Sequence, residues 1–174
     1  LIDRLLVTLE KYPEYIFHLD AQTVVLDDYL EFRPEKEGVL RQHISEGRLI
    51  VGPWYVQNDF FLTSGESTVR NLLEGVRTAS RFGRCARVGY APDQFGNVSQ
   101  LPQILDGFRV DSFVFGRGYA KMQKDENGNL NRVGGPTEFM WKGADGTEKL
   151  AIHMAYWYNN AQRFSEDIDR SMTN

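Results

Sequence analysis

Acidic and aromatic side chains follow the short apolar segments that we expect to form strands. Asp20 follows residues 15–19, the run from Trp54 to Asp59 follows residues 48–52, Asp93 follows residues 87–90 and Arg117 follows residues 112–115. A carboxylate can act as a nucleophile, an acid–base group or a metal ligand. A sugar needs hydrogen bonds to its hydroxyls and aromatic planes against its ring, and this mixture of side chains supplies both. The four segments therefore predict a carbohydrate site.

Helical and strand-like patterns alternate along the first 115 residues. Helices are predicted over residues 1–11, 34–46, 66–82 and 102–108, and strands over residues 15–19, 48–52, 87–90 and 112–115. This alternation is typical of βαβ units around a parallel sheet. Because functional groups gather at the carboxyl ends of such strands, we expect Asp20, residues 54–59, Asp93 and Arg117 to lie at one edge of the sheet.

The C-terminal part of the chain carries turn signals. Residues 121–137 are polar and contain Asn127-Gly128-Asn129, which predicts a hairpin or a flexible loop. Asp145-Gly146, between residues 138–141 and 149–153, is a strong two-residue hairpin signal. The chain opens inside an amphipathic pattern at Leu1 and ends without a helix cap. Since no linker or repeat interrupts it, we expect residues 1–174 to be one partial domain, truncated at both ends.

Composition and charge exclude several classes of protein. Hydrophobic residues make up 41% and charged residues 25%, which is an ordinary globular mixture. The net charge of −4 and the scattered lysines and arginines argue against nucleic acid as a partner. No apolar run reaches the roughly 20 residues of a membrane helix. The single cysteine, Cys85, cannot form an internal disulfide, so we expect a cytoplasmic protein, with a homo-oligomer left open.

One segment resembles the active site of a known family. Residues 89–105 contain Pro92-Asp93-Gln94-Phe95-Gly96, followed by Gln100-Leu101-Pro102-Gln103-Ile104-Leu105. This order is similar to the active-site segment of glycoside hydrolase family 38, the retaining α-mannosidases, and of its bacterial branch in particular. Residues 27–30, 33–35, 47–49, 52–55 and 64–73 resemble the same family in the same order. The resemblance covers nearly the whole chain.

The resemblance implies a mechanism and a fold. Asp93 matches the nucleophile that also binds zinc, and Phe95, Arg117 and Tyr158 match residues of the substrate pocket. A carboxylate nucleophile forms a covalent mannosyl-enzyme that water hydrolyses with retention, and the substrate is then an α-mannoside or oligosaccharide. The implied fold is α/β, a parallel-stranded (β/α) barrel-like catalytic domain of the glycoside hydrolase/deacetylase type. The general acid and the other metal ligands are expected outside residues 1–174, which leaves the isolated fragment inactive.

Two other functions compete with this interpretation. A metal-dependent polysaccharide deacetylase calls for paired aspartates at a strand end, whereas Asp27-Asp28 falls elsewhere. A non-catalytic carbohydrate-binding fragment fits the missing ligands, although binding modules are usually β-sandwiches and this chain shows a βαβ pattern.

Several of the polar residues have simpler structural interpretations. Asp93 can cap the helix that follows it, and Asp20 is equally well a turn acid or a residue at the rim of the sugar site. Asp59 fits a surface acid somewhat better than a sugar ligand. His18, His43 and His153 lack the spacing of metal ligands, and Trp54 and Cys85 suit packing. Asn97 stands where many family members carry histidine.

Overall fold

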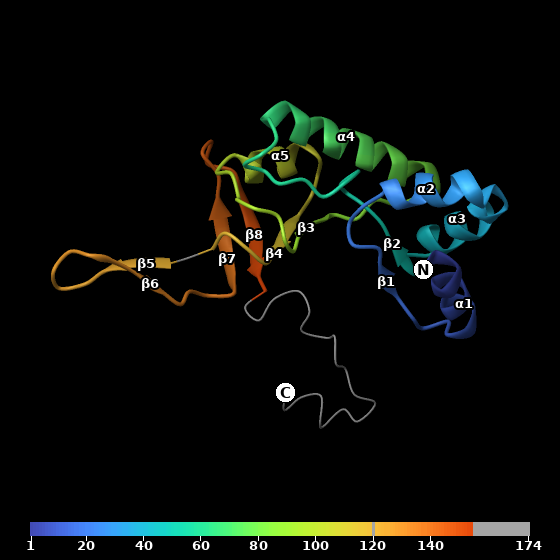
Figure 1. The fold of residues 1–174 in the computed structure, drawn as a ribbon, viewed down its shortest axis with the longest axis horizontal. Helices are drawn as coiled ribbons and strands as arrows, with labels where there is room; N and C mark the ends of the chain where they lie inside the picture. Colours follow the sequence, from blue (N-terminus) through green and yellow to red (C-terminus); the bar gives the residue numbers. More distant parts are fainter. Residues whose placement is uncertain (120, 155–174) are drawn as a thin grey trace, which may run out of the picture.

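The structure, a computed structural model, describes residues 1–119 and 121–154 as a mixed α/β fold (Figure 1). The helices are α1 (Ile2–Lys11), α2 (Val24–Phe32), the 3-10 turn η1 (Pro34–Lys36), α3 (Glu37–Ser45), α4 (Gly65–Phe82) and α5 (Leu101–Gly107). The strands are β1 (Phe17–His18), β2 (Leu49–Ile50), β3 (Val88–Ala91), β4 (Ser112–Phe115), β5 (Lys121–Lys124), β6 (Leu130–Val133), β7 (Glu138–Lys142) and β8 (Glu148–His153).

The strands form three small sheets. β1 and β2 pair in parallel, β5 and β6 form an antiparallel hairpin, and the largest sheet has the order β3-β4-β8-β7. β3, β4 and β8 are parallel, while β7 is an antiparallel edge strand. The predicted parallel pairing is therefore present, but the described residues do not form a closed barrel. β2 and β3 do not pair with each other. The segments that follow β2 and precede β3 are joined by a hydrogen bond of 2.8 Å from the Ala86 N–H to the Val51 carbonyl.

A first core lies where α1, α2 and α3 meet β1 and β2. Leu5, Leu6 and Leu9 recur at helical spacing along α1, and they are buried against Leu40 and Ile44 of α3. The end of α1 is closed by Arg48, which donates to the Tyr12 carbonyl at 2.8 Å and also to the Leu9 carbonyl. This arrangement satisfies carbonyls that lack a partner within the helix.

A second core lies under the larger sheet. Phe113 and Phe115 of β4 and Ala151 of β8 pack against Leu101 and Leu105 of α5. The rings of Phe113 and Phe115 also lie 5.6 Å and 6.4 Å from Trp141 of β7. The larger sheet thus buries one face against α5 and its flanking loops.

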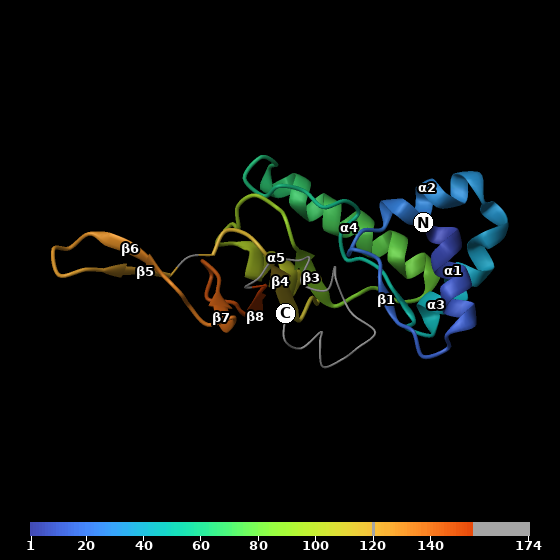
Figure 2. The ribbon, with the colours of Figure 1, turned by 60° about the horizontal axis from the view of Figure 1, so that its bottom comes forward.

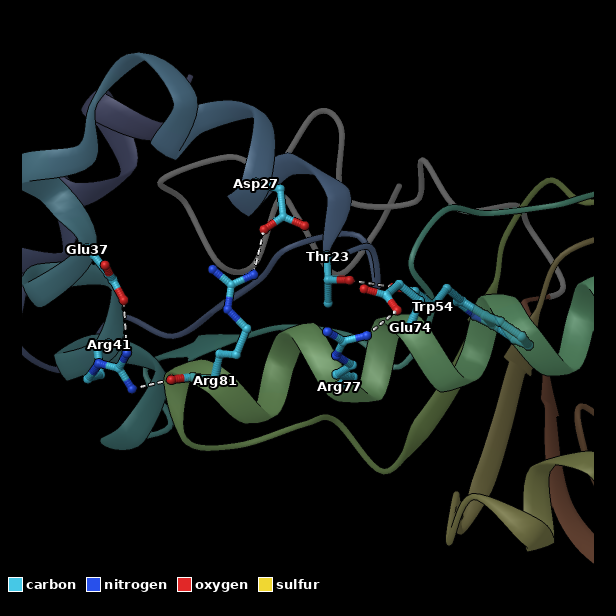
Figure 3. A network of polar contacts seen from close by, with 8 residues as sticks. All are labelled: Thr23, Asp27, Glu37, Arg41, Trp54, Glu74, Arg77 and Arg81. Carbon is cyan, nitrogen blue, oxygen red and sulfur yellow. Dashed lines mark hydrogen bonds and ion pairs between the residues drawn. The ribbon is translucent and has the colours of Figure 1, made fainter.

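Helix α4 spans both cores, with Leu72 in the second and Ala79 and Phe82 in the first (Figures 1 and 2). It begins at Ser64, whose side chain accepts a hydrogen bond from the Ser67 N–H, and it ends at Gly83 with φ of 122°. Its second half holds α2 and α3 by polar contacts (Figure 3). Arg81 pairs with Asp27 of α2 at 3.0 Å, and Arg41 of α3 donates to the Arg81 carbonyl.

Most predicted elements are present, and two of the helices differ from the prediction. The predicted helix over residues 34–46 is divided into η1 and α3. Helix α2 was not predicted, because Asp27-Asp28 interrupts its apolar spacing and only Leu26 is buried. Of the two alternatives for residues 121–137, the hairpin is present as β5 and β6. The hairpin around Asp145-Gly146 is confirmed as β7 and β8.

Candidate functional site

The ends of β3 and β4 bring Asp93 and Arg117 together. Ala91 at the end of β3 lies opposite Phe115 at the end of β4 in the parallel register. Asp93 and Arg117 each come two residues after these strand ends, so they leave the sheet at the same level. The Arg117 Nε donates to Oδ1 of Asp93. The two side chains stay partly open to solvent, with exposed fractions of 46% for Asp93 and 33% for Arg117. A carboxylate at this edge is thus fixed by a cation and still accessible.

The backbones that carry this pair approach each other closely at Gly116. A Cβ atom at Gly116 would lie 2.1 Å from the Pro92 carbonyl oxygen, so only glycine fits there. The Gly116 N–H donates to the Ala91 carbonyl at 3.2 Å, which continues the β3–β4 ladder toward the site. His153 lies behind this turn, and its Nε2 is 3.2 Å from the Gly116 carbonyl.

Phe95 completes what we call the Asp93 cluster, which consists of Asp93, Phe95 and Arg117. The guanidinium carbon of Arg117 lies 4.7 Å from the centre of the Phe95 ring, a cation–π distance. The ring is 57% exposed. The cluster therefore combines a carboxylate, a fixed cation and an open aromatic face, which can hydrogen-bond the hydroxyls of a sugar and pack against its ring.

Asp59 positions the loop of the Asp93 cluster. Its Oδ1 accepts a hydrogen bond of 2.7 Å from the Phe95 N–H, while the Phe61 N–H donates to the Phe95 carbonyl at 3.4 Å. The sequence favoured a surface acid here, and its spacing after the strand at residues 48–52 was the signal for a role at the site. The contact with Phe95 makes Asp59 a positioning residue.

Asn71 of α4 fixes the loop that carries Asp59, and the sequence patterns did not single it out. Its Oδ1 accepts from the backbone N–H groups of Tyr55 and Val56, at 3.0 Å and 2.9 Å. Its Nδ2 donates to the Val56 carbonyl and to Oδ1 of Asn58, both at 2.7 Å. An asparagine inside a helix carries no pattern that predicts such a clamp, so only the tertiary structure identifies it.

Gln94 and Trp54 support the base of the site. Gln94 is 5% exposed, and its Oε1 accepts from the Asp93 N–H at 3.2 Å, so a buried amide steadies the backbone of Asp93. Trp54 is fully buried, as the packing interpretation predicts, and its Nε1 donates to the Tyr90 carbonyl at 2.9 Å. Both side chains hold the end of β3 in place.

The other acids considered in the sequence, Asp20 and Asp27, make their contacts with residues outside the Asp93 cluster. Asp20 sits in a turn with φ of 47°, and its Oδ2 accepts from Nε2 of Gln22 at 3.2 Å, which fits a turn acid. Asp27 lies in α2 and pairs with Arg81, so Asp27-Asp28 is not at a strand end. The arrangement that a deacetylase would need is therefore absent from this pair.

Burial shifts the pKa values of His18 and Cys85 in opposite directions. Burial lowers the pKa of His18, and the nearby Asp20 carboxylate partly opposes that shift. The His18 ring meets Tyr90 edge to face, with centroids 5.6 Å apart. Burial raises the pKa of Cys85 to about 11, which fits the packing role expected of this thiol. His43 is buried and approaches Arg48, with Nδ1 and Nη1 3.5 Å apart.

The remaining predictions concern Tyr158, a metal site and membrane-spanning helices. Tyr158 lies outside the described residues. Within residues 1–119 and 121–154, no three His, Cys, Asp or Glu side chains are grouped so as to hold a metal ion. In the same part of the chain, no helix is long and apolar enough to cross a membrane.

Comparisons with known proteins agree on one family. Residues 1–174 match the model of the glycosyl hydrolases family 38 N-terminal domain. The chain is 40% identical, over 99% of its length, to a predicted mannosylglycerate hydrolase of Halalkalibacterium halodurans. It is 33% identical, over 84% of its length, to an alpha-mannosidase of Saccharomyces cerevisiae. The crystal structure of an alpha-mannosidase from Enterococcus faecalis V583 superposes with a TM-score of 0.81 over 92% of the chain, at 37% identity.

The chain spans only a small part of each of these proteins. It covers 20% of the Halalkalibacterium protein, 13% of the Saccharomyces enzyme and 18% of the Enterococcus chain.

Proposed function

This chain belongs to glycoside hydrolase family 38, and from that premise we propose that the longer protein containing it hydrolyses α-mannosides with retention, using Asp93 and a zinc ion. Family membership implies a glycosidase with a carbohydrate substrate. The observation that carries the finer proposal is the pairing of Asp93 with Arg117 at the carboxyl ends of β3 and β4. It places an accessible, oriented carboxylate where parallel α/β folds carry their active sites.

In the proposed reaction, the Asp93 carboxylate attacks the anomeric carbon as the bond to the leaving group breaks. The resulting mannosyl-enzyme is hydrolysed by water, and two inversions give net retention. Arg117 orients the carboxylate through Oδ1, which leaves Oδ2 for the anomeric carbon or the metal. Phe95 offers its exposed ring to the sugar. Tyr158 is proposed to join them in the substrate pocket.

Zinc fits the donor chemistry of Asp93, since carboxylate oxygens are among its usual ligands. Asp93 is the ligand proposed from this chain, and the others, with the general acid, are expected outside residues 1–174. When bound, zinc would polarise the sugar hydroxyls and neutralise negative charge at the site.

The parallel pair β1–β2 and the parallel strands β3, β4 and β8 are proposed to be parts of a barrel that the rest of the protein completes. A cavity of about 520 Å³ lies on one side of the strands and is lined by His18, Ile50, Val88, Tyr90 and Val114, among others. Phe113, Phe115 and Ala151 face the opposite side, where α5 covers them. Strands with apolar residues on both faces are typical of a barrel interior covered by helices.

Two measurements on the full-length protein test the proposal. Proton NMR of an aryl α-mannoside hydrolysate should show α-mannose as the first product, before mutarotation. A β-anomer formed first would contradict retention. Prolonged treatment with a chelator should abolish activity, and added zinc should restore it. Full activity in the metal-free protein, verified by elemental analysis, would contradict the role of the metal.

A further inference from the structure

Two exposed apolar side chains adjoin the Asp93 cluster. Phe61 and Leu62 are 69% and 81% exposed, on the loop between β2 and α4. The preceding residue, Phe60, is only 4% exposed, and its ring lies 5.6 Å from that of Trp54. One aromatic ring therefore anchors the loop in the core, while the next two side chains form an apolar surface. Exposed apolar surfaces beside a polar site often bind ligands.

Phe61 is held firmly against the loop of the Asp93 cluster. A Cβ atom at Gly96 would lie 2.3 Å from Cγ of Phe61, so the ring packs directly on the Gly96 backbone. The Phe61 N–H donates to the Phe95 carbonyl, and Asp59 accepts from the Phe95 N–H. The turn is closed by the Leu62 and Thr63 N–H groups, which both donate to the Asp59 carbonyl at 3.1 Å. The ring is thus pre-positioned while most of its surface stays open.

We propose that Phe61, with Leu62, forms a subsite for the leaving group of the substrate, and that this leaving group is a second sugar ring. The inference rests on the proposed function and deepens it. Asp93 contacts Arg117, Arg117 lies over the Phe95 ring, and the Phe95 backbone is hydrogen-bonded to the backbone of Phe61. A substrate whose mannosyl unit lies at Asp93 and Phe95 can therefore extend onto the Phe61 ring.

The chemistry of residues 59–63 selects among leaving groups. The apolar face of a pyranose packs on an aromatic plane, which the Phe61 ring provides. A small anionic leaving group such as glycerate would meet no cation in this turn, whose sequence is Asp-Phe-Phe-Leu-Thr, and Asp59 would repel it. The surface therefore favours a neutral ring over an acid.

The test compares substrates with and without a ring in the leaving group, on the full-length enzyme. Phe61→Ala should lower kcat/KM for α-linked mannobiose about tenfold. It should leave kcat/KM for α-mannosyl fluoride unchanged, because the fluoride leaving group has no ring that could bind Phe61. Phe61→Trp should keep the wild-type ratio of the two substrates. The matched control is Phe32→Ala, which removes a 78% exposed phenylalanine at the end of α2. It should change neither value.

Each other outcome contradicts the subsite or the identity of its ligand. An equal loss on both substrates would mean that Phe61 only shapes the loop of the Asp93 cluster, and no loss on either would mean that it binds nothing there. Wild-type enzyme that prefers mannosylglycerate to every mannobiose linkage would contradict the sugar-ring leaving group alone. Wild-type enzyme inactive on all α-mannosides would instead refute the proposed function, and the subsite would fall with it.

Discussion

Oδ1 of Asp59 accepts a hydrogen bond of 2.7 Å from the backbone N–H of Phe95, so the loop after β2 holds the loop after β3. Asp59→Ala removes this acceptor, whereas Asp59→Asn keeps an oxygen in the same place. We expect Asp59→Ala to lower kcat/KM on an aryl α-mannoside by up to about tenfold, because a single hydrogen bond contributes about 0.5–1.5 kcal/mol. Asp59→Asn should retain most of the activity. Equal losses in the two variants would show that the carboxylate charge matters and the hydrogen bond does not.

Arg117 provides the second test of how the carboxylate of Asp93 is held. Arg117→Ala removes the donor to Oδ1 and the cation over the Phe95 ring. We expect kcat to fall about 10²–10³-fold, as for other fixed groups that organise charge in an active site. Arg117→Lys keeps the charge but not the planar guanidinium, so its kcat should lie between those of alanine and wild type. A loss of kcat below about threefold in Arg117→Ala would rule out this role.

Gly75 determines how closely α4 approaches the loop after β2. A Cβ atom there would lie 2.1 Å from the Pro53 carbonyl oxygen, with backbone on every nearby side. We expect Gly75→Ala to destabilise this region by about 1–3 kcal/mol, since the backbone must move. Hydrogen exchange of peptides from residues 65–82 should accelerate in the full-length protein.

Gly38→Ala is the matched control for Gly75→Ala. Gly38 also lies in a helix, α3, and a Cβ atom there meets nothing within 4 Å. This substitution should slow exchange in α3, because alanine favours a helix over glycine by about 0.5–1 kcal/mol. Protection of residues 65–82 that is unchanged in Gly75→Ala would refute the tight contact.

The thiol of Cys85 should resist alkylation in the folded protein. Burial raises its pKa to about 11, so only about one thiol in a thousand is ionised at pH 8. The rate with iodoacetamide should rise about tenfold per pH unit from pH 7 to pH 10, with no plateau near the ordinary thiol pKa of about 8.5. Unfolding in urea should restore the ordinary rate. Fast labelling of folded protein at pH 8, quantified by peptide mass spectrometry, would contradict the burial.

Local patterns predicted much of the fold and part of the site. Helix α4 follows from its Ser64 cap, its apolar spacing and Gly83, and β7 and β8 follow from Asp145-Gly146, since these signals act between neighbours in the chain. The meeting of Asp93 with Arg117 followed from the rule for parallel strands. By contrast, α2 depends on tertiary contacts, among them the Arg81–Asp27 ion pair. The roles of Asn71 and Asp59 depend on backbone groups distant in sequence, which no local pattern encodes.

The central claim is that Asp93 is the nucleophile. Its most direct test is to trap the mannosyl-enzyme with a fluorinated α-mannosyl fluoride, which reacts quickly and is released slowly, and to locate the label by peptide mass spectrometry of the full-length protein. We predict one mannosyl label per active site, on Asp93, and none in Asp93→Ala. A label on any other residue would contradict the assignment, and so would normal labelling of Asp93→Ala.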